Sequence, residues 1–304
     1  MLNKTSLEEQ NVTRDARIVR PALSGWKNWL GVVPFFLFSI LFILLPSLSL
    51  FIGSFQDAQG NFTLQNFADL TDPSIVAAYW VSIRISAAPA VGGGILGFFL
   101  AYGVTVGGLP RWVRSFLTTF SGVASNFAGV PLAFAFIATL GRTGLVTVVL
   151  KNIFNLDLYN QSFSLYSFWG LTLTYMFFQF PLMVLVITPA LDGLKKEWRE
   201  ASENLGANSF QYWTQIALPI LMPSLLATMI LLFGNAFGAY ATAQSLTGGF
   251  INLVTIVIGA QISGDVLHNV GLGYALAFGM VIIMIVSMVI YYALRRRSER
   301  CLRS

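Results

Sequence analysis

Residues 30–53 read LGVVPFFLFSILFILLPSLSLFIG and contain no Asp, Glu, Lys or Arg. A helix rises about 1.5 Å per residue, so about 20 apolar residues cross the hydrocarbon core of a bilayer, which is about 30 Å thick. Within that core a helix satisfies its own backbone hydrogen bonds, whereas irregular backbone does not. The stretch therefore predicts a transmembrane helix, and the fold class is predicted to be all-α integral membrane.

Five similar apolar segments follow along the 304 residues. The six predicted transmembrane helices are 30–53, 82–106, 116–139, 165–190, 221–246 and 272–293. The apolar stretch 250–262 is too short for an ordinary crossing, so it is predicted to be a short helix or re-entrant segment on the outer side. The composition agrees, because only 10% of the residues are charged, against about 25% in soluble proteins.

Positive charges fall mainly on one side of a six-span chain. Fifteen of the 18 Lys and Arg residues lie in the two terminal segments and in the second and fourth connections. The exceptions are Arg84, Arg142 and Lys151. Because basic residues in short loops are retained in the cytoplasm, both termini are predicted to be cytoplasmic. The net charge of +5 is interpreted as topology signals and contacts with membrane lipid, and nucleic acid is not expected as a partner.

One domain is predicted, with a short tail at each end. Residues 1–29 form a polar cytoplasmic tail, 30–293 the six-helix transmembrane domain, and 294–304 a basic cytoplasmic tail. The N-terminal segment lacks a short apolar core followed by a cleavage site, so the first span is expected to stay in the protein.

The chain lacks the residues that most enzyme reactions need. The only cysteine, Cys301, cannot form an internal disulfide, and the only histidine, His268, cannot build a histidine-based metal site. The pattern G-x-x-x-x-G-K-[ST] is absent, and the glycines at 92–94 lie in an apolar span, where they are expected to be positions at which helices pack or bend. We therefore predict no catalytic residues, no metal site and no ATP hydrolysis by this chain.

The connection between the fourth and fifth spans, 191–222, differs from the others in length and charge. Residues 191–223 read LDGLKKEWREASENLGANSFQYWTQIALPILMP. The apolar or small residues that share one helix face are Leu194, Trp198, Ala201 and Leu205. Ion pairs are expected four residues apart, between Lys196 and Glu200 and between Arg199 and Glu203.

Gly206 stands where a helix would end in a left-handed residue, and a second short helix, 209–217, is predicted to lead to Pro219. The connection is thus predicted to be a helix, a turn and a helix at the cytoplasmic surface. Periodicity alone allows two interpretations: the first helix rests in the lipid headgroups, or it presents a face to a partner protein.

The same connection carries a recognisable motif. It follows the pattern EAA-x₃-G-x₉-I-x-L-P, with Ser202 replacing the second Ala. Its residues are Glu200, Ala201 and Ser202, then Gly206 after three spacers, and Ile216, Leu218 and Pro219 after nine more. This resembles the cytoplasmic loop signature of the membrane subunits of binding-protein-dependent ABC importers. The motif covers about 20 residues, and the hydropathy pattern of the whole chain is similar to that family.

The resemblance implies that 191–222 contains a coupling helix that docks into a cleft of a cytoplasmic ATPase, with Trp198 and Leu205 beside the motif residues. It implies partners: two copies of an ABC ATPase, a second membrane permease subunit and an extracytoplasmic solute-binding protein. ATP and Mg²⁺ would be bound by the ATPase, so no cofactor is expected in this chain. The location implied is the bacterial cytoplasmic (inner) membrane, with several crossings.

Polar residues inside spans are costly and often functional. Asn126, Gln179 and Asn235 are the expected lining of a translocation path, with Tyr240 as a further lining residue and Phe178 as a gate. The alternative for each is a structural role, such as a hydrogen bond between helices. Pro131 and Pro181 are predicted kinks beside these residues.

The solute is inferred from similarity alone. The layout resembles the spermidine/putrescine branch of these importers and its relatives for iron(III), thiamine and aminophosphonates. A polyamine is the first expectation, and the predicted outer side offers the carboxylates Asp57, Asp69, Asp72, Asp157 and Asp265. A secondary carrier would need an intramembrane ion site and an inverted repeat, and a membrane enzyme would need a partner for His268; neither pattern is visible.

Overall fold

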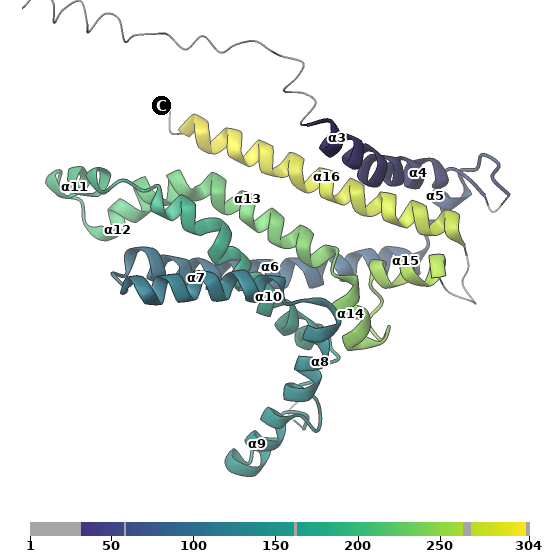
Figure 1. The fold of residues 1–304 in the computed structure, drawn as a ribbon, viewed down its shortest axis with the longest axis horizontal. Helices are drawn as coiled ribbons and strands as arrows, with labels where there is room; N and C mark the ends of the chain where they lie inside the picture. Colours follow the sequence, from purple (N-terminus) through teal and green to yellow (C-terminus); the bar gives the residue numbers. More distant parts are fainter. Residues whose placement is uncertain (1–31, 58, 161–162, 264–268, 302–304) are drawn as a thin grey trace, which may run out of the picture. The chain divides into compact units, whose positions relative to one another are not determined.

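The computed structural model describes residues 32–57, 59–160, 163–263 and 269–301 (Figure 1). Contacts divide the chain into two units, Met1–Ser49 and Leu50–Ser304. The predicted tail 1–29 lies outside the described residues. The first crossing, Val33–Gly53, consists of α3 (Val33–Ser39), a π-helical turn (Ile40–Leu44) and α4 (Leu45–Gly53).

Leu50–Ser304 is almost entirely helical where it is described, apart from one isolated bridge between Gln56 and Phe62. Its helices are α5 (Gln65–Asp69), α6 (Pro73–Val106), α7 (Arg111–Asn126), α8 (Gly129–Leu140), α9 (Leu145–Phe154), α10 (Phe168–Asp192), α11 (Lys196–Asn204), α12 (Ser209–Tyr212), α13 (Leu218–Phe237), α14 (Tyr240–Thr247), α15 (Val254–Ser263) and α16 (Val270–Cys301). A π-helical turn, Trp213–Ala217, joins α12 to α13.

Six segments of the described chain are long and apolar enough to cross a membrane, which confirms the predicted number. They are Val33–Gly53, Pro73–Val106, Gly129–Phe154, Phe168–Asp192, Ser209–Phe237 and Val270–Leu294. The predicted short apolar helix at 250–262 is present as α15. The basic tail predicted to begin at 294 continues the last span as a helix, because α16 extends to Cys301.

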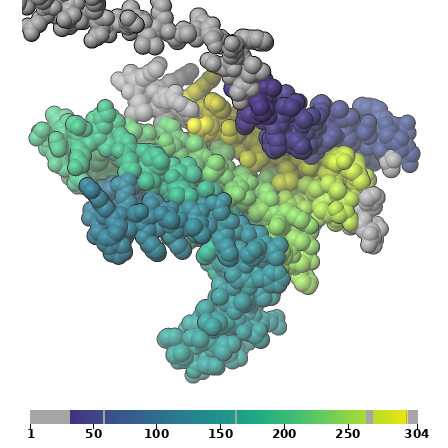
Figure 2. Space-filling model, viewed as in Figure 1, coloured from purple at the N-terminus to yellow at the C-terminus, as the bar shows by residue number. Residues whose placement is uncertain are grey.

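The third span was predicted as one helix, 116–139, and this is wrong. Helix α7 ends at Asn126 and α8 begins at Gly129, which has φ +74°. Pro131 has no N–H to donate and its ring would clash with the carbonyl of Phe127, so an α-helix cannot run through this point undisturbed. Figure 2 shows α8 and α9, in teal, extending away from the rest of this unit. By contrast, α10 runs through Pro181 without interruption.

The fifth span was predicted as 221–246, and both limits are wrong. The helix begins at Ser209, because the π turn Trp213–Ala217 carries it into α13 through Pro219. It ends at Phe237, and α14 starts again at Tyr240 after a break at 238–239. Tyr240, placed by the sequence inside a span, is thus the first residue of a separate helix.

Helices α6 and α10 pack tightly through glycine. A Cβ atom on Gly97 would lie 2.5 Å from both Phe180 O and Met183 Cβ, and one on Gly93 would lie 2.8 Å from Gln179 Cβ. Lipid supplies no hydrophobic force between helices, so close backbone approach at small residues provides much of the packing energy. The glycines of α6 therefore determine how α10 sits in the unit.

We expect Gly97→Ala to lower the free energy of unfolding by about 1–3 kcal/mol, because the new methyl group overpacks against α10. Gly103→Ala is the matched control on the same helix, since nothing lies within 4 Å of its added Cβ. Thermal unfolding in detergent, followed by circular dichroism, measures both. A Gly97→Ala protein as stable as the Gly103→Ala protein would contradict the packing described.

Candidate functional site

Helix α11 is a short charged helix whose end is fixed by Gly206. Of the two predicted ion pairs, the described side chains form Arg199 Nε–Glu203 Oε1 at 3.0 Å. Gly206 has φ +79°; its N–H donates to Glu203 O, and the Ala207 N–H donates to Ser202 O, both at 3.0 Å. These two bonds are the Schellman arrangement, which needs a left-handed residue at this position. The left-handed helix end predicted at Gly206 is confirmed.

The turn after α11 is short and closed by a second cap. The Asn208 side chain accepts from the Gln211 N–H at 2.9 Å, and the Asn208 N–H donates to Gln211 Oε1 at 2.8 Å. The helix that follows was predicted to stop at residue 217, but it continues into α13. The structure therefore joins α11 to a membrane-crossing helix through a turn that is hydrogen-bonded at both ends.

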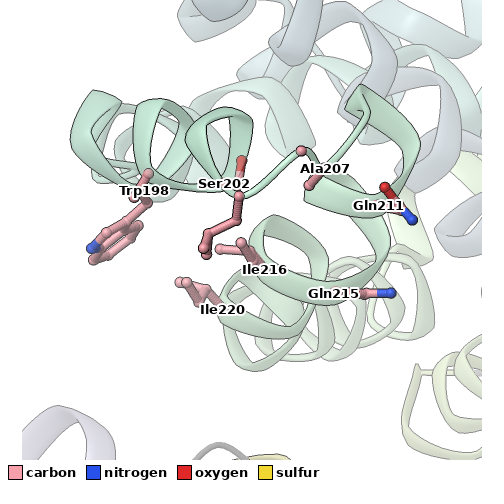
Figure 3. Close-up of a pocket in the computed structure, with 10 residues that line it drawn as sticks. Trp198, Ser202, Ala207, Gln211, Gln215, Ile216 and Ile220 are labelled. Carbon is pink, nitrogen blue, oxygen red and sulfur yellow. The ribbon is translucent and has the colours of Figure 1, made fainter.

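A hollow of about 600 Å³ lies between α11 and the beginning of the next helix (Figure 3). Its lining residues are Trp198, Ala201, Ser202, Leu205, Gly206, Ala207, Gln211, Gln215, Ile216 and Ile220. Six of the nine residues predicted for ATPase coupling are among them. Ser202 is buried, and its hydroxyl donates to Arg199 O at 2.7 Å within the same helix. This bond explains how Ser replaces Ala at a packed position without leaving a polar group unpaired.

The other three predicted coupling residues lie elsewhere on the same elements. Glu200 is exposed and does not line the hollow, while Leu218 and Pro219 are half-buried at the start of α13. Sequence reasoning missed four of the lining residues: Ala207, Gln211, Gln215 and Ile220. For the last three, the signal was the four-residue spacing of 211 with 215 and of 216 with 220, which is visible only when the helix is continued through Pro219.

Two predicted path residues prove to be inside the bundle. Gln179 is 0% exposed, and its Nε2 donates to Leu232 O on α13 at 2.7 Å. Phe178 is 1% exposed and packs on Tyr175, with 5.5 Å between ring centroids. In this conformation neither side chain reaches the surface of the subunit. The structural alternative, a hydrogen bond between helices, is the one that Gln179 adopts.

The remaining path candidates are exposed. Asn126 is the last residue of α7, and Tyr240, 42% exposed, is the first of α14, so each adjoins one of the two helix breaks. Asn235 lines an apolar hollow of about 590 Å³ with Met284 and Met288 of α16. The sequence analysis had grouped these residues only because each is a polar residue in an apolar segment.

A hydrogen bond from a neighbouring helix supports each of the two helix breaks. The Gly129 N–H at the start of α8 donates to Thr242 Oγ1 of α14 at 2.8 Å. The Tyr175 hydroxyl donates at 2.8 Å to Ala239 O, inside the second break. Side chains thus satisfy backbone groups that the helices leave free, as a low-dielectric surrounding requires.

The predicted outer residues Lys151 and Asp157 form an ion pair at the end of α9. The Lys151 Nζ lies 3.0 Å from Asp157 Oδ2, and this hydrogen bond lowers the pKa of the Asp157 carboxyl. In the part of the chain that the structure describes, no three His, Cys, Asp or Glu side chains come together as metal ligands.

Comparison with known proteins places this arrangement in a family. Residues 93–300 match the model of the family described as "Binding-protein-dependent transport system inner membrane component". A probable sulfate transport system permease protein, cysT, of Helicosporidium sp. subsp. Simulium jonesii is 29% identical over 214 residues, covering 69% of this chain and 73% of the relative. The spermidine/putrescine permease PotB of Haemophilus influenzae is 24% identical over 279 residues, covering 86% and 91%.

A third relative, a putative ferric transport system permease protein of Haemophilus influenzae, FbpB 1, is 26% identical over 218 residues, covering 70% of this chain and 33% of the relative. Among solved structures, a bacterial alginate ABC transporter in complex with an alginate-bound periplasmic protein contains a chain that matches with a TM-score of 0.72. The identity is 15%, and the match covers 95% of this chain and 96% of that one, so the likeness concerns the fold.

The family match covers more than half of the residues, and the fold agrees with it. The chain therefore belongs to the inner membrane components of binding-protein-dependent transport systems: it is a permease subunit of an ABC importer and a multi-pass protein of the inner membrane.

Proposed function

We propose that α11 is the coupling helix of this permease, the surface that receives the motion of two cytoplasmic ATPase subunits. The single observation that carries the proposal is the hydrogen-bonded turn that joins α11 to a membrane-crossing helix around a hollow lined by the motif residues. Leu205 and Phe210 beside it are 88% and 76% exposed. Exposed apolar side chains at the end of a bundle favour contact with another protein.

The connection suits the transmission of a displacement. Caps at Gly206 and Asn208 fix the angle between α11 and α12, and the π turn Trp213–Ala217 continues the helix into α13. Trp213 also contacts Tyr102 of α6, with ring centroids 4.9 Å apart. A force on α11 would thus reach α13 and α6 together, and closure of the ATPase dimer on ATP would change their tilt.

The other parts of the proposed importer are a second membrane permease subunit and an extracytoplasmic solute-binding protein. ATP and Mg²⁺ are bound by the ATPase subunits, so this chain needs no cofactor of its own. Support comes from the family to which the chain belongs, because its description names dependence on a binding protein.

Charge reversal or strain in α11 should uncouple the importer. We expect both Glu200→Lys and Gly206→Asp to leave the protein inserted while uptake falls to background. The first variant reverses the charge that pairs with the ATPase, and the second puts a side chain at φ +79°. Uptake into proteoliposomes and solute-stimulated ATP hydrolysis are the measurements.

Glu203→Lys is the matched control, because it makes the same charge change on α11 but removes only the exposed pair with Arg199. Such a pair contributes about 0.3–0.5 kcal/mol, so uptake should stay near the level of the unmodified protein. Full uptake by the Glu200→Lys or Gly206→Asp protein would show that α11 is not the coupling helix.

We further propose that the surface at the two helix breaks faces the translocation path, which lies between this subunit and the second permease subunit. Non-helical backbone at membrane depth is tolerated only where it meets protein or lines water. Asn126 and Tyr240 are exposed on either side of these breaks, and lipid would be a poor neighbour for both. Phe178 and Gln179 are not part of this proposal, because they are buried.

Cysteine labelling tests the path. In a Cys301→Ser background, Asn126→Cys and Tyr240→Cys in the assembled importer should react with a charged thiol reagent at least about tenfold faster than two controls, since the reactive thiolate needs water. The controls are Gln179→Cys, which is buried, and Phe99→Cys, whose native side chain is 65% exposed on the apolar helix α6. Equal rates at Asn126→Cys and Phe99→Cys would place the breaks against lipid.

A polyamine is the proposed solute, by analogy with the spermidine/putrescine permease PotB; the sulfate and ferric permeases among the relatives supply the alternatives to test. At the end of the bundle away from α11, a hollow of about 600 Å³ is lined by Asp57 and Asp69. A backbone hydrogen bond from Asn61 lowers the pKa of Asp57, so this carboxyl is ionised at neutral pH and suits a cation.

The purified importer with its solute-binding protein should hydrolyse ATP faster with spermidine or putrescine than with sulfate, iron(III), thiamine or an aminophosphonate. Stimulation by sulfate alone would contradict the polyamine and leave the importer role intact. Uptake driven by an ion gradient with no ATPase present would contradict the importer role itself.

A further inference from the structure

A second hollow, of about 440 Å³, lies beside a different face of α11 from the one that lines the hollow of Figure 3. Three cationic side chains, Lys195, Lys196 and Arg199, line it. The rest of the lining consists of Thr105, Val106, Gly108, Leu191, Asp192, Leu194, Tyr212 and Trp213. We call this set of residues the basic hollow.

The basic hollow carries a net positive charge. Its one carboxylate among the described residues, Asp192, is already paired with Arg114 of α7. Arg199 is held by Glu203, and the Lys195 ammonium lies over the Trp198 ring at 5.8 Å from its centroid. Lys195 and Lys196 form no ion pair among the described residues, and excess positive charge in a concave site attracts an anion.

The ends of two candidate spans form part of the wall of the basic hollow, a position that suits lipid headgroups. Val106 is the last residue of α6, and Leu191 is the last but one of α10, so two membrane-crossing helices end in its wall. Tyr212 and Trp213 complete the wall, and such aromatic residues collect at the interface between hydrocarbon and water. Cations, aromatic rings and span ends therefore meet in one place.

We propose that the basic hollow binds the phosphate of an anionic phospholipid in the leaflet at this end of the bundle. The two lysines would donate to the phosphate oxygens, while the acyl chains would continue along the apolar helices. A lipid in the basic hollow would leave the hollow of Figure 3 free, because that hollow is lined by other residues of this segment: Trp198, Ala201, Ser202 and Leu205. A lipid held here would bridge α11 and the end of α6, next to the proposed coupling contact.

Lipid binding does not depend on the coupling role of α11, so the two proposals fail separately. The importer is reconstituted in nanodiscs of phosphatidylcholine with a minority of phosphatidylglycerol, and native mass spectrometry counts the lipids that each released complex retains. We expect enrichment of phosphatidylglycerol over the nanodisc composition, and its reduction by about tenfold in the Lys195→Gln/Lys196→Gln variant. The uncoupled Gly206→Asp complex should retain the lipid.

Two variants control for charge and for folding. Lys195→Arg/Lys196→Arg keeps both charges and should keep the enrichment. Arg111→Gln removes one charge at the start of α7, outside the basic hollow, and should also keep it. Equal enrichment in the unmodified and Lys195→Gln/Lys196→Gln complexes would overturn the proposal.

The source of the phosphate is tested in detergent, where Trp213 in the wall of the hollow reports binding by fluorescence against a Trp213→Phe reference. A short-chain phosphatidylglycerol should change the signal, and inorganic phosphate at equal concentration should not. If inorganic phosphate gives the same change at the same concentration, the hollow is a site for free anions, and the lipid assignment is wrong.

Discussion

Inside a bilayer every backbone N–H and C=O must find a partner within the protein, and the structure of this permease depends on that constraint. Where the helices are continuous, the requirement is met locally, and glycines such as Gly97 let the helices approach closely. Where they break, Thr242 and Tyr175 supply the missing partners from neighbouring helices. The breaks are thus supported features of the fold, and the same constraint motivates the proposal that the exposed surface beside them faces water or protein.

In our proposals, two faces of α11 connect the membrane-spanning helices to their surroundings. One face lines a hollow of small and apolar residues that continues into α13, and another carries the lysines of the basic hollow. The turn between α11 and α12 is hydrogen-bonded at both ends. Such a turn transmits a displacement of α11 better than a flexible loop would, because the angle between the two helices changes little. An anionic headgroup beside the same helix would set its resting position against the membrane.

Much of this fold was predictable from charge and periodicity. Charge-free segments predicted six crossings, the apolar spacing of Leu194, Trp198, Ala201 and Leu205 predicted the helix, and Gly206 predicted its end. Pro131 was predicted only to kink a continuous helix, and no break was predicted at Gly238, because a hydropathy pattern counts apolar residues and does not show where the backbone leaves the helix. The burial of Gln179 could not be predicted either. A polar residue in a span can face a translocation path or bond to a backbone carbonyl such as Leu232 O, and the sequence does not show how the helices pack.

The central claim is that α11 meets the ATPase, and photocrosslinking from its most exposed apolar residue tests this most directly. A photoreactive amino acid in place of Leu205, which is 88% exposed, is activated by light in the fully assembled importer. The account predicts a covalent product with the ATPase subunit, in a yield that changes when ATP is added. Products with lipid alone, with and without ATP, would contradict it.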